Sequence, residues 1–226
     1  MIPKRIIQTY KYTRLPLLFK ICQELIQIKC NEYEYILYTN ENCINFIKSN
    51  YPQYIEIYNN LSDKNKVFFF SLLELYKNGG IYIDLDCILY KKIDELINSD
   101  ISIFPLVNKE NIGKYFIMTN KNNKFILYLI LQISMYYNIN SNFITNNVLY
   151  KLFTKYKKNV VLICSEFKEC FGNFAHNIKI NSHGLYNDKY PNFFMSITYD
   201  EQKKRKTKYI LIRDLNWIQN SNYHFL

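Results

Sequence analysis

With 226 residues, the chain is long enough for one domain with a substantial hydrophobic core. Hydrophobic residues make up 49% of it and charged residues 21%, a composition that excludes an intrinsically disordered chain. The formal net charge of +10 favours phosphorylated ligands, other polyanions or an anionic membrane surface. No nucleic-acid-binding motif accompanies this charge, so we expect no nucleic-acid partner.

Short apolar strands alternate with helices in the first part of the chain. In chain order we expect a strand at 6–7 with a loop from Gln8 to Tyr10, a helix over 15–28, a strand over 33–38, a helix over 43–48 and a long helix over 63–78. The apolar stripe of the helix over 15–28 includes Cys22, Leu25 and Ile28.

A pair of glycines, Gly79 and Gly80, ends the long helix. One glycine is explained by a helix C-cap in a left-handed conformation. Two adjacent glycines also permit the close approach of a ligand or of another backbone segment. Both interpretations stay open at the level of the sequence.

The remaining elements begin with the apolar strand Ile81–Ile83. After it we expect a helix over 91–97, a strand over 101–104, an edge strand over 116–118, helices over 124–137 and 146–156, and strands over 159–164 and 209–212. The alternation of strands with helices predicts one α/β domain over residues 1–226, built on a mostly parallel central sheet.

Two carboxylates separated by one residue, Asp84 and Asp86, follow directly after the strand Ile81–Ile83. Two acids beside a buried strand are costly unless a positive charge compensates for them. In an extended segment, side chains two residues apart point to the same side, so both acids can bind one hard cation. Ligands of α/β sheets bind just beyond the carboxyl ends of strands, which is where these acids lie. The motif therefore predicts a site for Mn2+ or Mg2+ and a diphosphate, and hence transfer from an activated donor.

The cysteines and the apolar runs bear on the cellular compartment. The six cysteines form no CxxC pair and show no zinc-ligand spacing. The first residues lack the apolar core of a signal peptide, and no run approaches a membrane-spanning length of about 20 apolar residues. These features predict reduced thiols and a cytoplasmic protein, for which peripheral contact with a membrane stays open.

A resemblance to a known family rests on four groups of residues in a familiar order. They are Ile2–Lys4 with Gln8–Lys11, Tyr33–Thr39, Phe46–Ile47 with Tyr51–Pro52, and Leu75–Asp86. On these residues the chain resembles the Asp-x-Asp sugar transferases of the glycosyltransferase family 32 type. That family includes yeast initiation-specific mannosyltransferases, capsule-synthesis transferases and, more distantly, the glucosylating clostridial toxins. The resemblance covers the first half of the chain well and extends weakly into 116–125 and 145–150.

The resemblance implies a fold and an activity. The fold would be a GT-A-like, Rossmann-related domain with a nucleotide-sugar-binding half over 1–107 and an acceptor-side half over 108–226. The activity would be transfer of a hexose or N-acetylhexosamine from a nucleotide diphosphate sugar to a hydroxyl group of a glycan, protein or lipid acceptor. In this family the reaction usually retains the configuration at the anomeric carbon and uses Mn2+.

The resemblance also implies roles for individual residues. Asp84 and Asp86 match the catalytic acids that bind the metal and the donor. The implied donor-binding residues are Gln8, Thr9 and Tyr10 near the nucleotide base, Lys66 as a positive charge on the long helix, and Gly79, Gly80 and Tyr82 on the strand that enters the site.

Three positions depart from the family pattern: Ile7 stands where a His is usual, Phe68 where an Asp is usual, and Ser71 where an Arg is usual. These departures keep open a second interpretation, a degenerate transferase fold that acts as a binding or structural module. A third and less favoured interpretation is an aspartate-nucleophile phosphatase, whose first motif resembles residues 83–89. The later part of the chain offers further candidates for the site, which are His176, His183, Asp188, Asp214 and Trp217.

Overall fold

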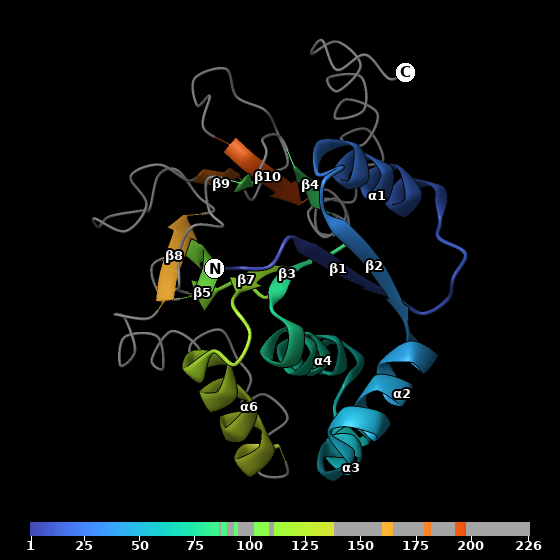
Figure 1. Cartoon of the computed structure of the whole chain (residues 1–226), viewed down its shortest axis with the longest axis vertical. Helices are drawn as coiled ribbons and strands as arrows, with labels where there is room; N and C mark the ends of the chain where they lie inside the picture. The colour runs from blue at the N-terminus through green and yellow to red at the C-terminus, as the bar shows by residue number, and fades with distance from the viewer. Residues whose placement is uncertain are drawn as a thin grey trace.

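The computed structural model describes residues 1–85, 87–89, 93–94, 102–108, 111–137, 160–164, 179–181 and 193–197. The described strands form a single sheet in the order β2-β1-β3-β7-β5-β8-β9-β10-β4, with β6 paired to β5 (Figure 1). The strands are β1 (Arg5–Tyr10), β2 (Glu34–Thr39), β3 (Gly80–Ile83), β4 (Cys87–Leu89), β5 (Ser102–Asn108), β6 (Asn111–Ile112), β7 (Phe116–Thr119), β8 (Val160–Cys164), β9 (Lys179–Asn181) and β10 (Phe193–Ile197).

The sheet is mostly parallel, as the sequence predicts. β1 runs parallel to both β2 and β3, and β5, β8, β9 and β10 are parallel to their neighbours in that order. β7 runs antiparallel between β3 and β5, and β4 runs antiparallel to β10. The sheet order and the helices on both faces give a mixed α/β fold.

The prediction that residues 116–118 form an edge strand is wrong. β7 lies inside the sheet, where its residues pair with β3 from Gly80 opposite Thr119 to Ile83 opposite Phe116. All four residues of β7 are buried. Such a continuous buried run is typical of a strand that is covered on both faces, which an edge strand of an open sheet rarely is.

Helices cover the two faces of the sheet unequally (Figure 1). One face carries α1 (Leu17–Lys29), and the other carries α2 (Asn40–Asn50), α3 (Ile55–Asn60), α4 (Asp63–Asn78) and α6 (Lys124–Tyr136), with a short 3-10 turn at Pro52–Tyr54. Side chains of β3 alternate between these faces. Ile81 and Ile83 belong to the same apolar cluster as Ile26 of α1, whereas Tyr82 belongs to the cluster that contains Phe68 of α4.

The predicted helices are confirmed where the structure describes them, and the boundaries of α1, α2 and α6 differ from those predicted. α4 has the predicted bounds, and Gly79 follows it with a positive φ of 68°, as a C-cap glycine does. α2 is longer than predicted because Thr39 and Asn42 form a reciprocal capping box at its start. In α1 the apolar stripe is displaced, since Ile26 is buried and Ile28 is 64% exposed. The predicted segments 146–156 and 209–212, and most of 91–97, lie outside the described residues.

A buried ion pair joins β1 to α4 at the amino ends of β1 and β3. Nη2 of Arg5 lies 3.1 Å from Oε1 of Glu74, and Nη1 donates to the carbonyl of Gly79 at 3.1 Å. Glu74 is fully buried, and its Oε1 also accepts hydrogen bonds from Asn78 and Tyr38. Burial raises the pKa of the Glu74 carboxyl, while Arg5 and the other donors oppose this rise. The pair therefore compensates a charge that would otherwise be costly in the core.

Candidate functional site

Asp84 lies directly beyond the carboxyl end of β3, at the position that the sequence predicts for a site acid. Its side chain is half-buried, and Oδ1 accepts a hydrogen bond of 2.6 Å from the hydroxyl of Tyr82. Burial, with the charge of Asp84 close by, raises the pKa of Tyr82 well above its usual value. The phenol therefore stays protonated and donates to the carboxylate. Thr9 Oγ1 lies 3.3 Å from the same hydroxyl, which extends the hydrogen-bonded group to β1.

The main chain at Asp84 is held from three directions. Its N–H donates to the carbonyl of Tyr115 at 2.9 Å, just before β7. Its carbonyl accepts from Nε2 of Gln8 at 3.2 Å and from the N–H of Cys87 at 3.1 Å. These bonds fix the turn after β3 and so define the direction in which the carboxylate points.

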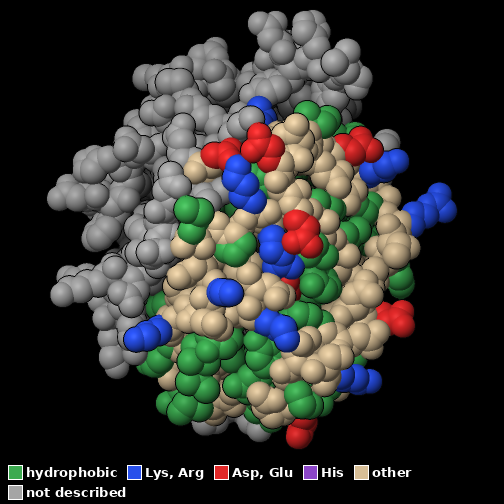
Figure 2. Space-filling view, in the orientation of Figure 1, with side chains coloured by type: hydrophobic (Ala, Val, Ile, Leu, Met, Phe, Trp, Pro, Cys, Tyr) green, Lys and Arg blue, Asp and Glu red, His purple; other side chains and the backbone are tan. Residues whose placement is uncertain are grey.

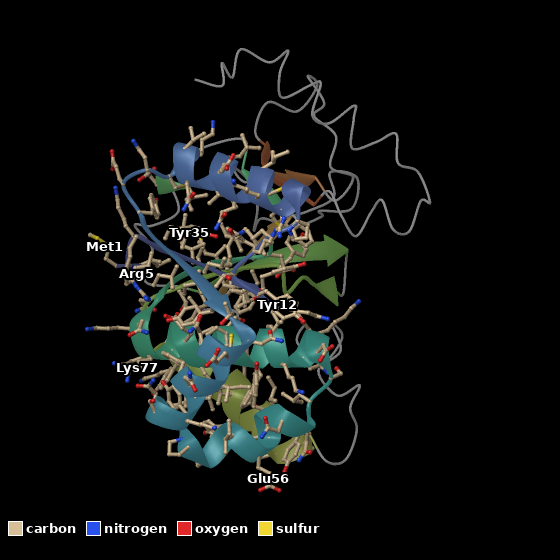
Figure 3. All side chains as sticks on the ribbon, turned by 90° about the vertical axis from the view of Figure 1, so that its right-hand side faces the viewer. Met1, Arg5, Tyr12, Tyr35, Glu56 and Lys77 are labelled. Atoms are coloured by element: carbon tan, nitrogen blue, oxygen red, sulfur yellow. The ribbon has the colours of Figure 1, made fainter. Side chains whose placement is uncertain are left out.

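The sequence predicts Gln8 in a loop, and this prediction is wrong. Gln8 lies inside β1, where it is fully buried. Its Oε1 accepts from the hydroxyl of Tyr35 at 2.7 Å, and that hydroxyl accepts from Nε2 of Gln23 at 2.9 Å. Both lie on the side of the sheet that α1 covers, and Figure 3 shows Tyr35 between α1 and the strands. Gln8 is thus a positioning residue for the Asp84 turn. Tyr35 and Gln23 were missed because their contact with Gln8 joins distant segments.

Thr9 and Tyr10 complete the carboxyl end of β1. Thr9 is half-buried and contacts Tyr82, so it belongs to the group around Asp84. Tyr10 is half-buried, and its ring packs edge-to-face on Phe19 of α1 with 5.5 Å between the ring centroids. Both residues belong to strand β1 and not to the predicted loop. Their position near a nucleotide base, which the resemblance implies, stays a prediction.

α4 leads through Gly79 into β3, and the helix and the strand run in opposite directions. The first turns of α4 therefore lie at the same end of the sheet as Asp84. Phe68 is part of the core, and Ser71 is fully buried with its hydroxyl donating to the Phe68 carbonyl at 2.7 Å. Lys66, one turn earlier, is half-buried.

Lys114 is a residue at this end of the sheet that sequence reasoning missed. It directly precedes Tyr115, and its Nζ lies 4.9 Å from the centroid of the Phe68 ring. Burial, with the charge of Lys64 nearby, lowers the pKa of Lys114 to about 8. A lysine between two short strands carries no periodic signal, so the sequence offered nothing to single it out.

Gly79 and Gly80 lie at the opposite end of β3 from Asp84. A Cβ on Gly79 would come within 2.7 Å of the Lys121 nitrogen, and a Cβ on Gly80 within 2.8 Å of the Arg5 carbonyl oxygen. The backbone interpretation of this glycine pair is therefore confirmed. The resemblance implies a donor-binding role for this pair, but the structure places it away from Asp84.

The oxygen ligands at this site fit a hard divalent cation in kind. Asp84 supplies a carboxylate, and cations such as Mg2+ accept one or two carboxylates together with water and phosphate oxygens. Asp86 lies outside the described residues, as do His176, His183, Asp188, Asp214 and Trp217. Among the residues that the structure describes, no cluster of three or more His, Cys, Asp or Glu side chains is present. A metal here would thus depend on Asp84, Asp86 and a phosphorylated ligand.

Comparison with known proteins connects this geometry to a family. Residues 17–102 match the model of a glycosyltransferase sugar-binding region containing the DXD motif. Over 101 residues the chain is 37% identical to inositol phosphoceramide mannosyltransferase 2 of Schizosaccharomyces pombe, covering 43% of this chain and 28% of that protein. Over 100 residues it is 34% identical to mannosyl phosphorylinositol ceramide synthase SUR1 of Saccharomyces cerevisiae, covering 43% and 26%. The chain thus spans only about a quarter of the length of these curated relatives.

A solved structure supports the fold over a longer stretch. The PaToxG glycosyltransferase superposes with a TM-score of 0.53 over 69% of this chain and 70% of its own, at 18% sequence identity. This likeness shows the fold alone. The family that the chain resembles, through the matched segment and the two curated relatives, is that of the DXD-containing glycosyltransferases. None of the helices within the described part of the chain has the length and apolar character needed to cross a membrane.

Proposed function

We propose that this chain transfers a hexose or N-acetylhexosamine from a nucleotide diphosphate sugar to an acceptor hydroxyl. The observation that carries the proposal is the Asp84 carboxylate, which Tyr82 holds at the carboxyl end of β3 within the segment that matches the sugar-binding family. A carboxylate fixed in this place is suited to a donor whose phosphates arrive with a cation.

In this proposal Asp84 and Asp86 would hold Mn2+ or Mg2+, which would neutralise charge on the leaving diphosphate. Tyr82 fixes the Asp84 carboxylate, and Gln8 and Tyr115 fix the turn that carries it. The acceptor oxygen forms a bond to the anomeric carbon, and the bond from that carbon to the phosphate oxygen breaks. The electron pair leaves with the nucleoside diphosphate, and a diphosphate oxygen takes the hydroxyl proton. Attack from the leaving-group face would retain the anomeric configuration.

The relatives suggest where to begin with donor and acceptor. The two matched yeast proteins are named for mannosyl transfer and for ceramide lipids that contain phosphoinositol. We therefore propose mannose as the first sugar to test and a glycolipid as the first acceptor class. A phosphorylated lipid also suits the formal net charge of +10. Residence in the cytoplasm, with contact limited to the membrane surface, stays a prediction.

The test is donor hydrolysis and transfer, measured with the full chain, Mn2+ and a panel of nucleotide diphosphate sugars. We expect turnover of at least one donor, loss of turnover on chelation of the metal, and loss in the Asp86→Ala variant with its melting temperature nearly unchanged. Transfer to phosphoinositol ceramide should exceed transfer to water. A variant that keeps wild-type turnover without Asp86 would contradict the assignment of the acids.

A second function is favoured by Phe68 and Ser71, which are buried in α4 at positions where transferases of this kind use charged groups. The chain would then be a binding module that retains the nucleotide site without catalysis. Calorimetry separates the two functions. Heat from Mn2+-dependent nucleotide binding without turnover of any donor would favour the binding module, and turnover would exclude it.

A further inference from the structure

We propose that Lys114 binds the diphosphate of the donor, and that Lys64 assists it from the first turn of α4. This inference rests on the proposed function and names a residue that supplies positive charge to the site. The chain needs such a group because α4 presents the phenyl ring of Phe68 and the internally bonded hydroxyl of Ser71, neither of which can neutralise a phosphate.

The position of Lys114 follows from the pairing of β3 with β7. Ile83 lies opposite Phe116, and the Asp84 N–H bonds to the Tyr115 carbonyl. Lys114 comes one residue before Tyr115 and thus belongs to the segment beside the Asp84 turn. The two charged groups come from neighbouring segments at one end of the sheet.

The two side chains also point to the same face of the sheet. Asp84 reaches the hydroxyl of Tyr82, and the Tyr82 ring packs in the apolar cluster that includes Phe68. Lys114 places its ammonium group 4.9 Å from the centroid of that Phe68 ring. The Lys114 ammonium group and the Asp84 carboxylate therefore both lie on the α4 face at this end of the sheet, where together they can bind a diphosphate with its cation.

The start of α4 adds to this positive field. Lys64 lies near enough to Lys114 for their charges to interact unfavourably, and the burial of Lys114 adds to the cost of its charge. The N-cap residue Ser62 makes no side-chain hydrogen bond to the first turn, whose N–H groups favour anions. Asp63 supplies one exposed carboxylate to the same turn. An anion between the two lysines would relieve their repulsion.

The chemistry specifies a diphosphate better than a monophosphate. In a diphosphate, one phosphate group can bind the cation held by the acids while the second contacts the lysines. A monophosphate can bind the cation or the lysines, but not both in this way. Arginine keeps the positive charge and also packs on aromatic faces, so Lys114→Arg should retain diphosphate binding. Methionine should preserve the apolar contact with Phe68 while removing the charge.

The experiment is calorimetric titration of the full chain with Mn2+ and GDP or UDP, with the matching monophosphates as comparison ligands. For Lys114→Met we expect diphosphate affinity to fall about tenfold and monophosphate affinity to fall less than about threefold. Lys114→Arg should stay within about threefold of wild type. Lys77→Met is the matched control, because Lys77 lies exposed at the far end of α4, near Arg5 and away from Tyr12 (Figure 3).

A second variant changes an exposed residue and leaves the Lys114 side chain in place. Lys64 is exposed, so Lys64→Glu should fold normally and should weaken diphosphate binding about tenfold by placing a negative charge beside Lys114. Wild-type diphosphate affinity in Lys114→Met, or in Lys64→Glu, would overturn the inference and leave the proposed function intact. A wild-type chain that binds no nucleoside diphosphate with Mn2+ would overturn both.

Discussion

The hydroxyl of Tyr82, in β3, donates over 2.6 Å to Oδ1 of Asp84, which lies directly beyond the carboxyl end of that strand. Tyr82 is buried, and its ring belongs to the core cluster under α4. The core of the protein thus extends directly to the site acid through a single side chain. Packing of the Tyr82 ring and orientation of the carboxylate are therefore coupled.

Tyr82→Phe should keep the packing and lose the orientation. We expect Mn2+-dependent nucleotide affinity to fall about tenfold, because the Asp84 carboxylate loses its charge-assisted hydrogen bond. The measurement is calorimetry on Tyr82→Phe and on Tyr58→Phe, a matched change at a buried tyrosine in α3. Equal affinity in the two variants would show that the Tyr82 hydroxyl does not orient the acid.

Gln8→Leu separates the position of Gln8 in the structure from the role that the sequence predicts. In β1, Gln8 links Tyr35 to the Asp84 carbonyl, so its loss should lower the free energy of unfolding by about 1–3 kcal/mol. A residue that contacts a nucleotide base would instead change the preference between GDP and UDP without lowering stability. Urea denaturation and calorimetry with both nucleotides distinguish these results.

Arg5→Met should be among the most destabilising single changes in this half of the chain. It leaves the buried Glu74 carboxylate without its cation, which costs about 3–5 kcal/mol. The double variant Arg5→Met with Glu74→Gln removes the uncompensated charge and should recover part of the loss. Urea unfolding curves of both variants test this, and a double variant no more stable than Arg5→Met would contradict the account.

Lys114→Met should raise stability near neutral pH. The pKa of Lys114 is lowered to about 8 by burial, with Lys64 adding to the effect, so the charged form is disfavoured in the folded protein. The cost, on the order of 3 kcal/mol, is present below pH 8 and declines as the pH rises toward the usual lysine value. Thermal unfolding of both proteins between pH 7 and pH 9.5 should therefore show a difference that shrinks with rising pH. A constant difference would indicate a change in packing alone.

Two large apolar side chains of α6 are exposed. Leu131 is 43% exposed and Met135 60% exposed, one helical turn apart. Figure 2 shows hydrophobic side chains gathered near the lower left edge of the described surface, in the region of α6 in Figure 1. Single exposed apolar residues are common on soluble proteins, so this area does not by itself define a partner.

Much of the frame around Asp84 could be predicted from the sequence because it depends on local signals. The helix over 63–78 contains a largely apolar run that is buried from Phe68 to Leu75, and a glycine follows its last residue; both signals act within a few residues. The strand that leads to Asp84 is an apolar run of β-forming residues. Such local preferences predict the final structure well because they agree with the tertiary contacts that the same segments make.

The remaining features depend on which segments meet in three dimensions. The sequence predicts that the first strand ends before Gln8, but Tyr35 and the Asp84 carbonyl provide hydrogen bonds that make the burial of this polar side chain possible. Residues 116–118 form an apolar run, but such a run does not indicate which strands lie on either side of it in the sheet. Lys114 contacts the ring of Phe68, which is far away in the sequence.

The partners of β3 have a consequence for how this domain can be divided. Its two hydrogen-bonded neighbours are β1, over residues 5–10, and β7, over residues 116–119. The family-matched stretch, residues 17–102, contains neither of them. A fragment trimmed to that stretch would present β3 with bare edges on both sides and would invite intermolecular pairing. The segment that matches the family model is therefore shorter than the part of the chain that is needed to complete the sheet around β3.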